Sequence, residues 1–95
     1  MSSLANYRVA ELLYTQKNYQ AAVNSYRDCL RGDGDPRWTE VWSHIRLGNI
    51  FDVTGQRDRA VNEYRLAIQT NDNTQGALNE ARQDLQKPFQ RPVDE

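Results

Sequence analysis

The feature that most constrains this sequence is an internal repeat with an offset of 38 residues. Small residues of the first half fall on small residues of the second, and large apolar residues mostly fall on large ones. The matched pairs are Ala10 with Gly48, Leu13 with Phe51, Tyr19 with Arg57, Ala22 with Ala60, Tyr26 with Tyr64, Cys29 with Ala67 and Leu30 with Ile68. Because a small residue lets two helix backbones approach while a nearby aromatic ring fills the space beside them, this pattern predicts two copies of one helix-packing unit.

Five segments have apolar residues at the three- and four-residue spacing of a helix, and none has the sustained alternation of a strand. The expected helices cover about residues 4–15, 19–30, 36–53, 57–70 and 74–86. Gly32 ends the second helix, and Thr74 can cap the fifth. Asp35 and Pro36 are suited to cap and open the third. The sequence therefore predicts an all-α fold of two helix pairs followed by a C-terminal helix.

The residues of this repeat resemble the tetratricopeptide repeat (TPR) family. In the second copy, the family's opening pattern is matched by His44, Leu47, Gly48 and Phe51, and its later small–aromatic pair by Ala60 and Tyr64, with Ala67 following. In the first copy, the same positions hold Asn6, Val9, Ala10 and Leu13, then Ala22 and Tyr26. The resemblance implies a solenoid of helix pairs. It implies one domain at residues 1–86, with repeats at about 3–34 and 41–74, a capping helix at about 74–86 and an extended or disordered tail at 87–95.

The repeat in this chain is longer than the roughly 34 residues of the family. We place the additional residues between Gly32 and Glu40, as an extra turn at the front of the third helix. Trp38 would then project beyond the repeat surface. Two repeats are fewer than the roughly three that independent stability needs, so we expect the fifth helix or a second molecule to cap the stack.

The resemblance also implies where a partner would bind, because in the family the first helix of each pair lines a concave wall that carries most peptide-binding residues. At the matching positions, the predicted partner-binding residues are Tyr7, Glu11, Tyr14, Trp42, Ile45, Arg46, Asn49, Asp52, Asn79 and Gln83. Tyr14 and Trp42 fit the core as well as they fit this wall, whereas Tyr26 and Tyr64 are expected in the core. One subclass of the family clamps carboxylates with lysine, asparagine and arginine here, and Glu11 at that position argues against such a clamp.

We therefore expect a protein–protein interaction module, an adaptor or scaffold that binds a peptide or helix of its partner. The chain is expected to be part of a larger TPR protein. The alternative is a homo-oligomerisation module, in which a second copy covers the apolar surface left by Trp38.

The charge balance points away from nucleic acid and membrane partners. Twelve basic and thirteen acidic residues are scattered along the chain, without the basic excess that such binders carry. No stretch approaches the roughly 20 apolar residues of a membrane span. The single cysteine is compatible with a reducing compartment, which favours the cytoplasm.

No set of residues predicts an enzyme, a metal site or a cofactor. His44 is the only histidine and holds a helix-packing position, one turn from Glu40. Cys29 stands where the second copy has Ala67, as expected of a small packed residue. The acidic residues Asp33 and Asp35 lack the further oxygen ligands of a calcium loop.

Overall fold

The computed structural model describes residues 2–90, and within that range the chain is helical with no strand. Its elements are α1 (Ser3–Thr15), α2 (Tyr19–Leu30), α3 (Trp38–Val53), α4 (Arg57–Gln69), the 3-10 turn η1 (Thr74–Gly76) and α5 (Ala77–Gln86). The predicted all-α fold is confirmed. Residues 87–90 follow α5 without helical structure, and the remainder of the predicted tail, 91–95, lies outside the described residues.

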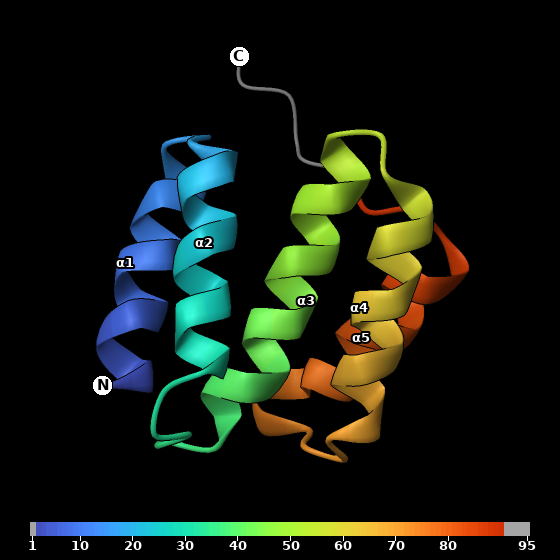
Figure 1. The fold of residues 1–95 in the computed structure, drawn as a ribbon. Coiled ribbons are helices and arrows are strands. Elements are labelled where there is room, and N and C mark those ends of the chain that lie inside the picture. Colours follow the sequence, from blue (N-terminus) through green and yellow to red (C-terminus); the bar gives the residue numbers. More distant parts are fainter. Residues whose placement is uncertain (1, 91–95) are drawn as a thin grey trace.

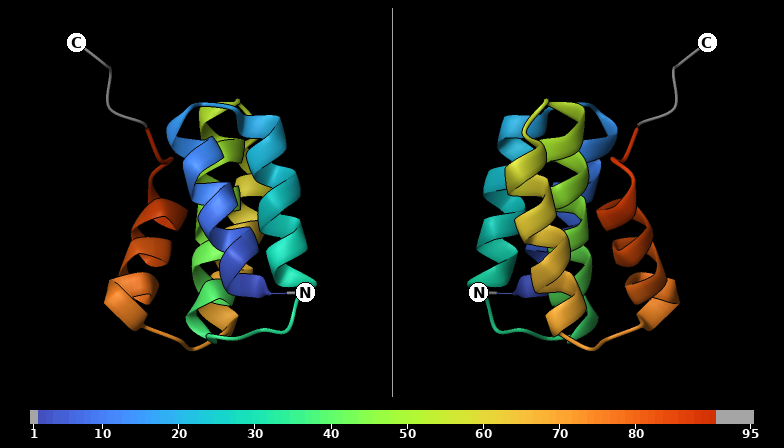
Figure 2. Two further views of the ribbon diagram at one scale, coloured as in Figure 1. Left: turned by 90° about the vertical axis from the view of Figure 1, so that its left-hand side faces the viewer. Right: turned by 90° about the vertical axis from the view of Figure 1, so that its right-hand side faces the viewer.

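The helices pack as two antiparallel pairs, α1 with α2 and α3 with α4 (Figure 1). The first pair contacts the second through α2 and α3, and α5 packs on α4 and α3 (Figure 2). The central helix is α3, because it contacts every other α-helix. This arrangement is the helix-pair solenoid expected from the repeat.

The small and aromatic residues of the repeat meet in the core as their spacing predicts. Tyr26 and Tyr64 are fully buried, as are Ala22 and Ala60. A methyl group built on Gly48 would lie 2.7 Å from Cδ1 and 2.8 Å from Cζ of the Tyr64 ring. Glycine therefore allows the close approach of α3 to α4 that places this ring.

The extra turn is located as predicted, but Trp38 does not project from it. Helix α3 has 16 residues against 13 in α1, and its additional residues are at its N-terminal end. The Trp38 ring is half-buried, and its centroid lies 5.2 Å from that of Tyr7 in an edge-to-face contact of 88°. The extra turn thus packs the Trp38 ring against Tyr7 of α1. The prediction that Trp38 projects beyond the repeat surface is wrong.

Two of the predicted helix caps are also wrong. Helix α3 begins at Trp38, and Arg37 precedes it as the N-cap residue without a side-chain cap; Asp35 lies further back, where its N–H donates to Asp33 Oδ1 at 3.1 Å. Helix α5 begins at Ala77 and is capped from further back, where Asn73 Oδ1 accepts from the Leu78 N–H at 2.9 Å. The Thr74 hydroxyl instead donates to Asp72 Oδ1 at 2.6 Å, in the preceding turn. Gln75, inside η1, has a positive φ of 54°, and Gly76, where η1 meets α5, has a φ of 76°.

Candidate protein-interaction surface

Helices α1, α3 and α5 carry the predicted wall, and its ten residues divide into three groups. Five side chains are partly exposed, namely Tyr7, Glu11, Tyr14, Trp42 and Arg46. Two residues, Asn79 and Gln83, are exposed. Interior side chains are Ile45, Asn49 and Asp52. The structure therefore brings the first group together around Arg46, places the second along α5, and removes the third from the surface.

Arg46 is the centre of the exposed part of this wall. Its Cζ lies 5.3 Å from the centroid of the Tyr14 ring and 5.4 Å from that of Trp42, so that rings from α1 and α3 flank it. Its Nε donates to Glu11 Oε1 at 3.1 Å. Burial alone would lower the pKa of Arg46, but the Glu11 carboxylate and the nearby tyrosines raise it, and the net shift is upward. The guanidinium is therefore a permanent cation with 26 % of its side chain exposed.

The Trp42 ring also holds the turn that leads into α5. Its indole Nε1 donates to the Thr74 carbonyl oxygen at 3.0 Å, across η1. Trp42 therefore has a contact within the fold in addition to its partly exposed edge, and its role in partner binding stays a prediction. The same holds for Tyr14, whose ring packs on Tyr19 at 6.1 Å as well as on Arg46.

The three interior residues are corrections to the predicted wall. Ile45 is fully buried among residues of α3, α4 and α5, where it packs with Val41, Ala67 and Ala77. Asn49 is also fully buried. The Asp52 side chain is 1 % exposed, and it accepts hydrogen bonds from Arg57 and Tyr64 instead of facing a partner.

Asn49 joins three helices through its amide. Its Oδ1 accepts from Arg46 Nη1 at 3.1 Å, and its Nδ2 donates both to Tyr64 Oη and to Asp84 Oδ2, each at 3.1 Å. The amide was predicted to bind the backbone of a peptide, but its oxygen and nitrogen are already engaged within the fold. It links the exposed Arg46 to the buried contacts of α4 and α5.

The first copy has a matching polar contact that sequence analysis did not identify. Tyr26 donates its hydroxyl proton to Glu11, whereas the Tyr64 hydroxyl accepts from Asn49 and donates to Asp52. Glu11 and Asn49 differ by the repeat offset, as do Tyr26 and Tyr64. An alignment of polar as well as apolar positions would have revealed this contact. No comparable signal in the sequence would have revealed Asp84, which lies beyond the second copy.

Part of the chain matches a known protein family. Residues 4–35, which span α1 and α2, match the family model described as tetratricopeptide repeat. The chain carries a tetratricopeptide repeat. The 38-residue offset extends the same pattern over α3 and α4, which lie outside the match. No curated protein and no solved structure matches the chain.

Beside its TPR helices, the described part of the chain has no group of three metal-ligating side chains. None of the helices in residues 2–90 has the length and apolar character needed to cross a membrane. His44 Nδ1 lies 2.9 Å from Glu63 Oε1 on α4, so its acidic partner is Glu63 and not Glu40. Cys29 is buried, and its Sγ accepts from the Ser43 hydroxyl at 3.2 Å. Both residues thus serve packing between the TPR helices.

Asp84 gives the TPR module a pH-dependent stability. Burial, first, and then the neighbouring Glu80 raise the pKa of Asp84 from 3.8 to about 7. Because the folded protein binds this proton more tightly than the unfolded chain, the contribution of Asp84 to stability falls as pH rises from about 4 to about 7. Asp84→Asn keeps a side-chain oxygen that accepts from the Asn49 amide, and it removes the carboxyl group that titrates. We expect it to be more stable than wild type by about 1–2 kcal/mol at pH 8 and nearly equal to it at pH 4.5.

Urea unfolding of both proteins at pH 4.5 and pH 8 measures this difference. Asp33 and Asp72 have pKa values below their usual range and are ionised at both pH values, so their contribution cancels. If the difference between Asp84→Asn and wild type is the same at both pH values, the raised pKa of Asp84 is wrong.

Proposed function

We propose that this chain is a protein-interaction module that binds a peptide or an exposed helix on the wall formed by α1, α3 and α5. It would act as an adaptor or scaffold within a larger TPR protein, with no catalytic step and no cofactor. Tetratricopeptide repeats generally mediate protein–protein interactions and are generally non-catalytic. The observation that supports this wall as the binding surface is the partly exposed Arg46 between the rings of Tyr14 and Trp42.

The chemistry of this cluster suits a peptide. Tyrosine and tryptophan rings supply rigid apolar area, and ordering them on binding costs little side-chain entropy. The Arg46 guanidinium is held in place by Glu11 and Asn49, so it presents its remaining donors without first having to be ordered. On α5, the exposed amides of Asn79 and Gln83 can each donate to and accept from an extended backbone.

The variants that test this proposal must leave the fold intact. Asn49 and Asp52 are interior, so the informative residues are Tyr14 on α1 and Gln83 on α5, at the two sides of the wall. We expect the double variant Tyr14→Ala, Gln83→Ala to weaken partner binding at least tenfold, because it removes a ring from the Arg46 cluster and an amide from α5. Affinity capture from lysate of the source cells, compared with wild type by mass spectrometry, measures this loss.

The matched control is Arg8→Ala with Arg82→Ala. Both residues are exposed and lie on the same two helices, but neither belongs to the predicted wall. The captured proteins should be the same for this control and for wild type. If a protein is captured equally by wild type and by the Tyr14, Gln83 variant, its binding site is not the wall.

A second candidate function is homo-oligomerisation, through α1 rather than Trp38. Val9 and Leu12 are 51 % and 59 % exposed and lie three residues apart, on one face of this helix. Their equivalents in the second copy, Leu47 and Ile50, are 1 % and 2 % exposed. A second molecule could cover Val9 and Leu12 in the same way.

Sedimentation equilibrium distinguishes this candidate from a monomeric module. If α1 mediates self-association, the apparent mass of the wild type rises with concentration, and Leu12→Glu restores the mass of one chain. A wild type that stays monomeric up to about millimolar concentration, where a weak dimer of Kd 1 mM would be half formed, argues against it.

A further inference from the structure

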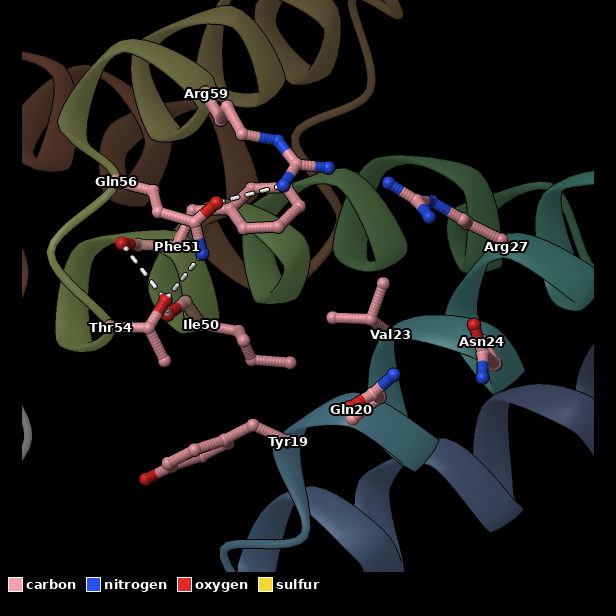
Figure 3. A pocket seen from close by; sticks show the side chains of 10 residues that line it. All are labelled: Tyr19, Gln20, Val23, Asn24, Arg27, Ile50, Phe51, Thr54, Gln56 and Arg59. Atoms are coloured by element: carbon pink, nitrogen blue, oxygen red, sulfur yellow. Dashed lines mark hydrogen bonds between the residues drawn. The ribbon is translucent and has the colours of Figure 1, made fainter.

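A pocket of about 300 Å³ lies outside the predicted wall, between α2 and the turn that joins α3 to α4 (Figure 3). Its lining residues are Tyr19, Gln20, Val23, Asn24, Arg27, Ile50, Phe51, Thr54, Gln56 and Arg59. None of them is among the predicted partner-binding residues. The volume is at the lower end of the range for ligand pockets and suits about two amino-acid residues.

The charged side chains that line this pocket are all positive. Arg27 and Arg59 are its only charged lining residues, and their guanidinium groups point toward one another over Val23 and Phe51 (Figure 3). Of the acidic residues on the same two helices, Asp28 and Glu63 are paired elsewhere, with Arg31 at 2.5 Å and His44 at 2.9 Å, and Asp58 does not line the pocket. Two facing cations without an anion repel each other, and an anionic group between them would relieve that repulsion.

The two arginines differ in how firmly they are held. The Cζ of Arg59 lies 4.2 Å from the centroid of the Phe51 ring, and its Nη1 donates to Gln56 Oε1 at 2.8 Å. Arg59 is therefore positioned before any ligand arrives, with further donors of its guanidinium available. Arg27 is exposed, and its side chain has no hydrogen-bond or ion-pair partner among residues 2–90. It can move onto a ligand without losing a contact.

The rest of the pocket suits a peptide more than a free ion. Ile50 and Phe51 are buried beneath it, and Val23 is half-buried beside them, so the floor is apolar. The amides of Gln20 and Asn24 lie along the α2 side, where they can pair with the N–H and C=O groups of a backbone.

We propose that this pocket binds an acidic peptide segment, with a carboxylate between Arg27 and Arg59 and the adjoining apolar side chain on Val23, Ile50 and Phe51. It is a second site, independent of the proposed wall, and it would let the module contact two segments of partner protein at once. The two sites share no residue, but Tyr14 of the wall packs on Tyr19 of the pocket, so variants that separate the sites must leave Tyr14 unchanged.

The probe for this site is N-acetyl-Leu-Asp-amide, and its matched control is N-acetyl-Leu-Asn-amide, which differs by the charge alone. In ¹⁵N NMR titrations of the full chain, we expect the Asp probe to shift the backbone amides of Val23 and Gln56 and the Nε–H signals of Arg27 and Arg59. The Asn probe should bind at least tenfold more weakly. Equal affinity of the two probes, or shifts confined to other residues, would overturn the proposal.

Two variants with the same change of net charge separate local from general electrostatics. We expect Arg27→Gln with Arg59→Gln to lose at least tenfold in affinity for the Asp probe, and Arg65→Gln with Arg82→Gln, at exposed positions outside the pocket, to keep the wild-type affinity. If the first variant does not fold, Arg27→Gln alone is used, because Arg27 has no partner to lose. A loss of affinity that is the same in both double variants contradicts the proposal.

A Gln83→Ala variant and inorganic phosphate complete the experiment. The Asp probe should bind Gln83→Ala as it binds wild type, because Gln83 belongs to the wall and does not line the pocket, and this separates the two sites. Phosphate should bind at least tenfold more weakly than the Asp probe, since it has no apolar part to cover Phe51. Phosphate binding as tight as that of the probe would show a general anion site and overturn the proposed acidic peptide.

Discussion

Gly48→Ala is expected to lower the free energy of unfolding by about 2 kcal/mol, although alanine is the better helix former. The added methyl group would lie 2.7 Å from Cδ1 of the Tyr64 ring, which is fully buried and cannot leave without opening the core. Overpacking of this kind costs about 1–3 kcal/mol, and the higher helix propensity of alanine offsets up to about 1 kcal/mol of it. Gly48 is therefore required by the contact of α3 with α4.

Urea unfolding followed by circular dichroism measures this change, and a double-mutant cycle assigns its cause. In a Tyr64→Leu background, which lacks the ring, Gly48→Ala should cost at least 1 kcal/mol less than in wild type. Asn62→Ala, at an exposed position of α4, is the control for helix propensity and should leave stability unchanged or slightly raised. A Gly48→Ala variant as stable as wild type would mean that α3 and α4 are further apart than the structure places them.

Asn49→Ala is expected to cost about 3 kcal/mol and to weaken the docking of α5. The change removes the hydrogen bonds of the Asn49 amide to Arg46, Tyr64 and Asp84, and it leaves a small cavity at a fully buried position. Leaving a buried polar group without its partner costs about 1–3 kcal/mol, and the groups that lose a bond here include a carboxyl and a guanidinium.

The same unfolding experiment measures the loss, with Asn79→Ala as its control. Asn79 is the other asparagine of the predicted wall, but it is exposed. Its replacement should therefore change stability by less than about 0.5 kcal/mol. Hydrogen exchange of the α5 amides should accelerate in Asn49→Ala and stay at the wild-type rate in Asn79→Ala. Equal stability of the two variants would contradict the buried position of Asn49.

Most of the fold could be predicted from the sequence because its signal is local and occurs twice. The spacing of small and aromatic residues depends only on the geometry of two packed helices. Ala22 and Ala60 are separated by the same 38 residues as Tyr26 and Tyr64, and all four are buried. The errors are at helix ends, where several polar residues compete for the same backbone groups. Thr74 was a plausible cap for α5, but its hydroxyl contacts Asp72, and Asn73 takes its place.

The candidate site could be predicted only in part, for a different reason. Whether a side chain on α3 faces solvent or the interior depends on where the next helix lies, and the sequence pattern of α3 does not contain that information. Ile45 packs with Ala77 and Ala81 of α5, and the Asn49 amide donates to the side chain of Asp84 on the same helix. Arg46, one position from Ile45, remains partly exposed. The wall proposed from the structure is therefore smaller than the predicted one and centres on Arg46.

The measurement that tests the proposed wall most directly is an NMR titration with a peptide selected on the immobilised wild type from a random library. We expect the largest shifts at the Arg46 Nε–H, the Trp42 indole N–H and the side-chain amides of Asn79 and Gln83. We also expect the Tyr14, Gln83 variant to bind the peptide at least tenfold more weakly. Shifts confined to the Arg27–Arg59 pocket, or to the Val9 and Leu12 face of α1, would contradict the wall as the principal binding surface.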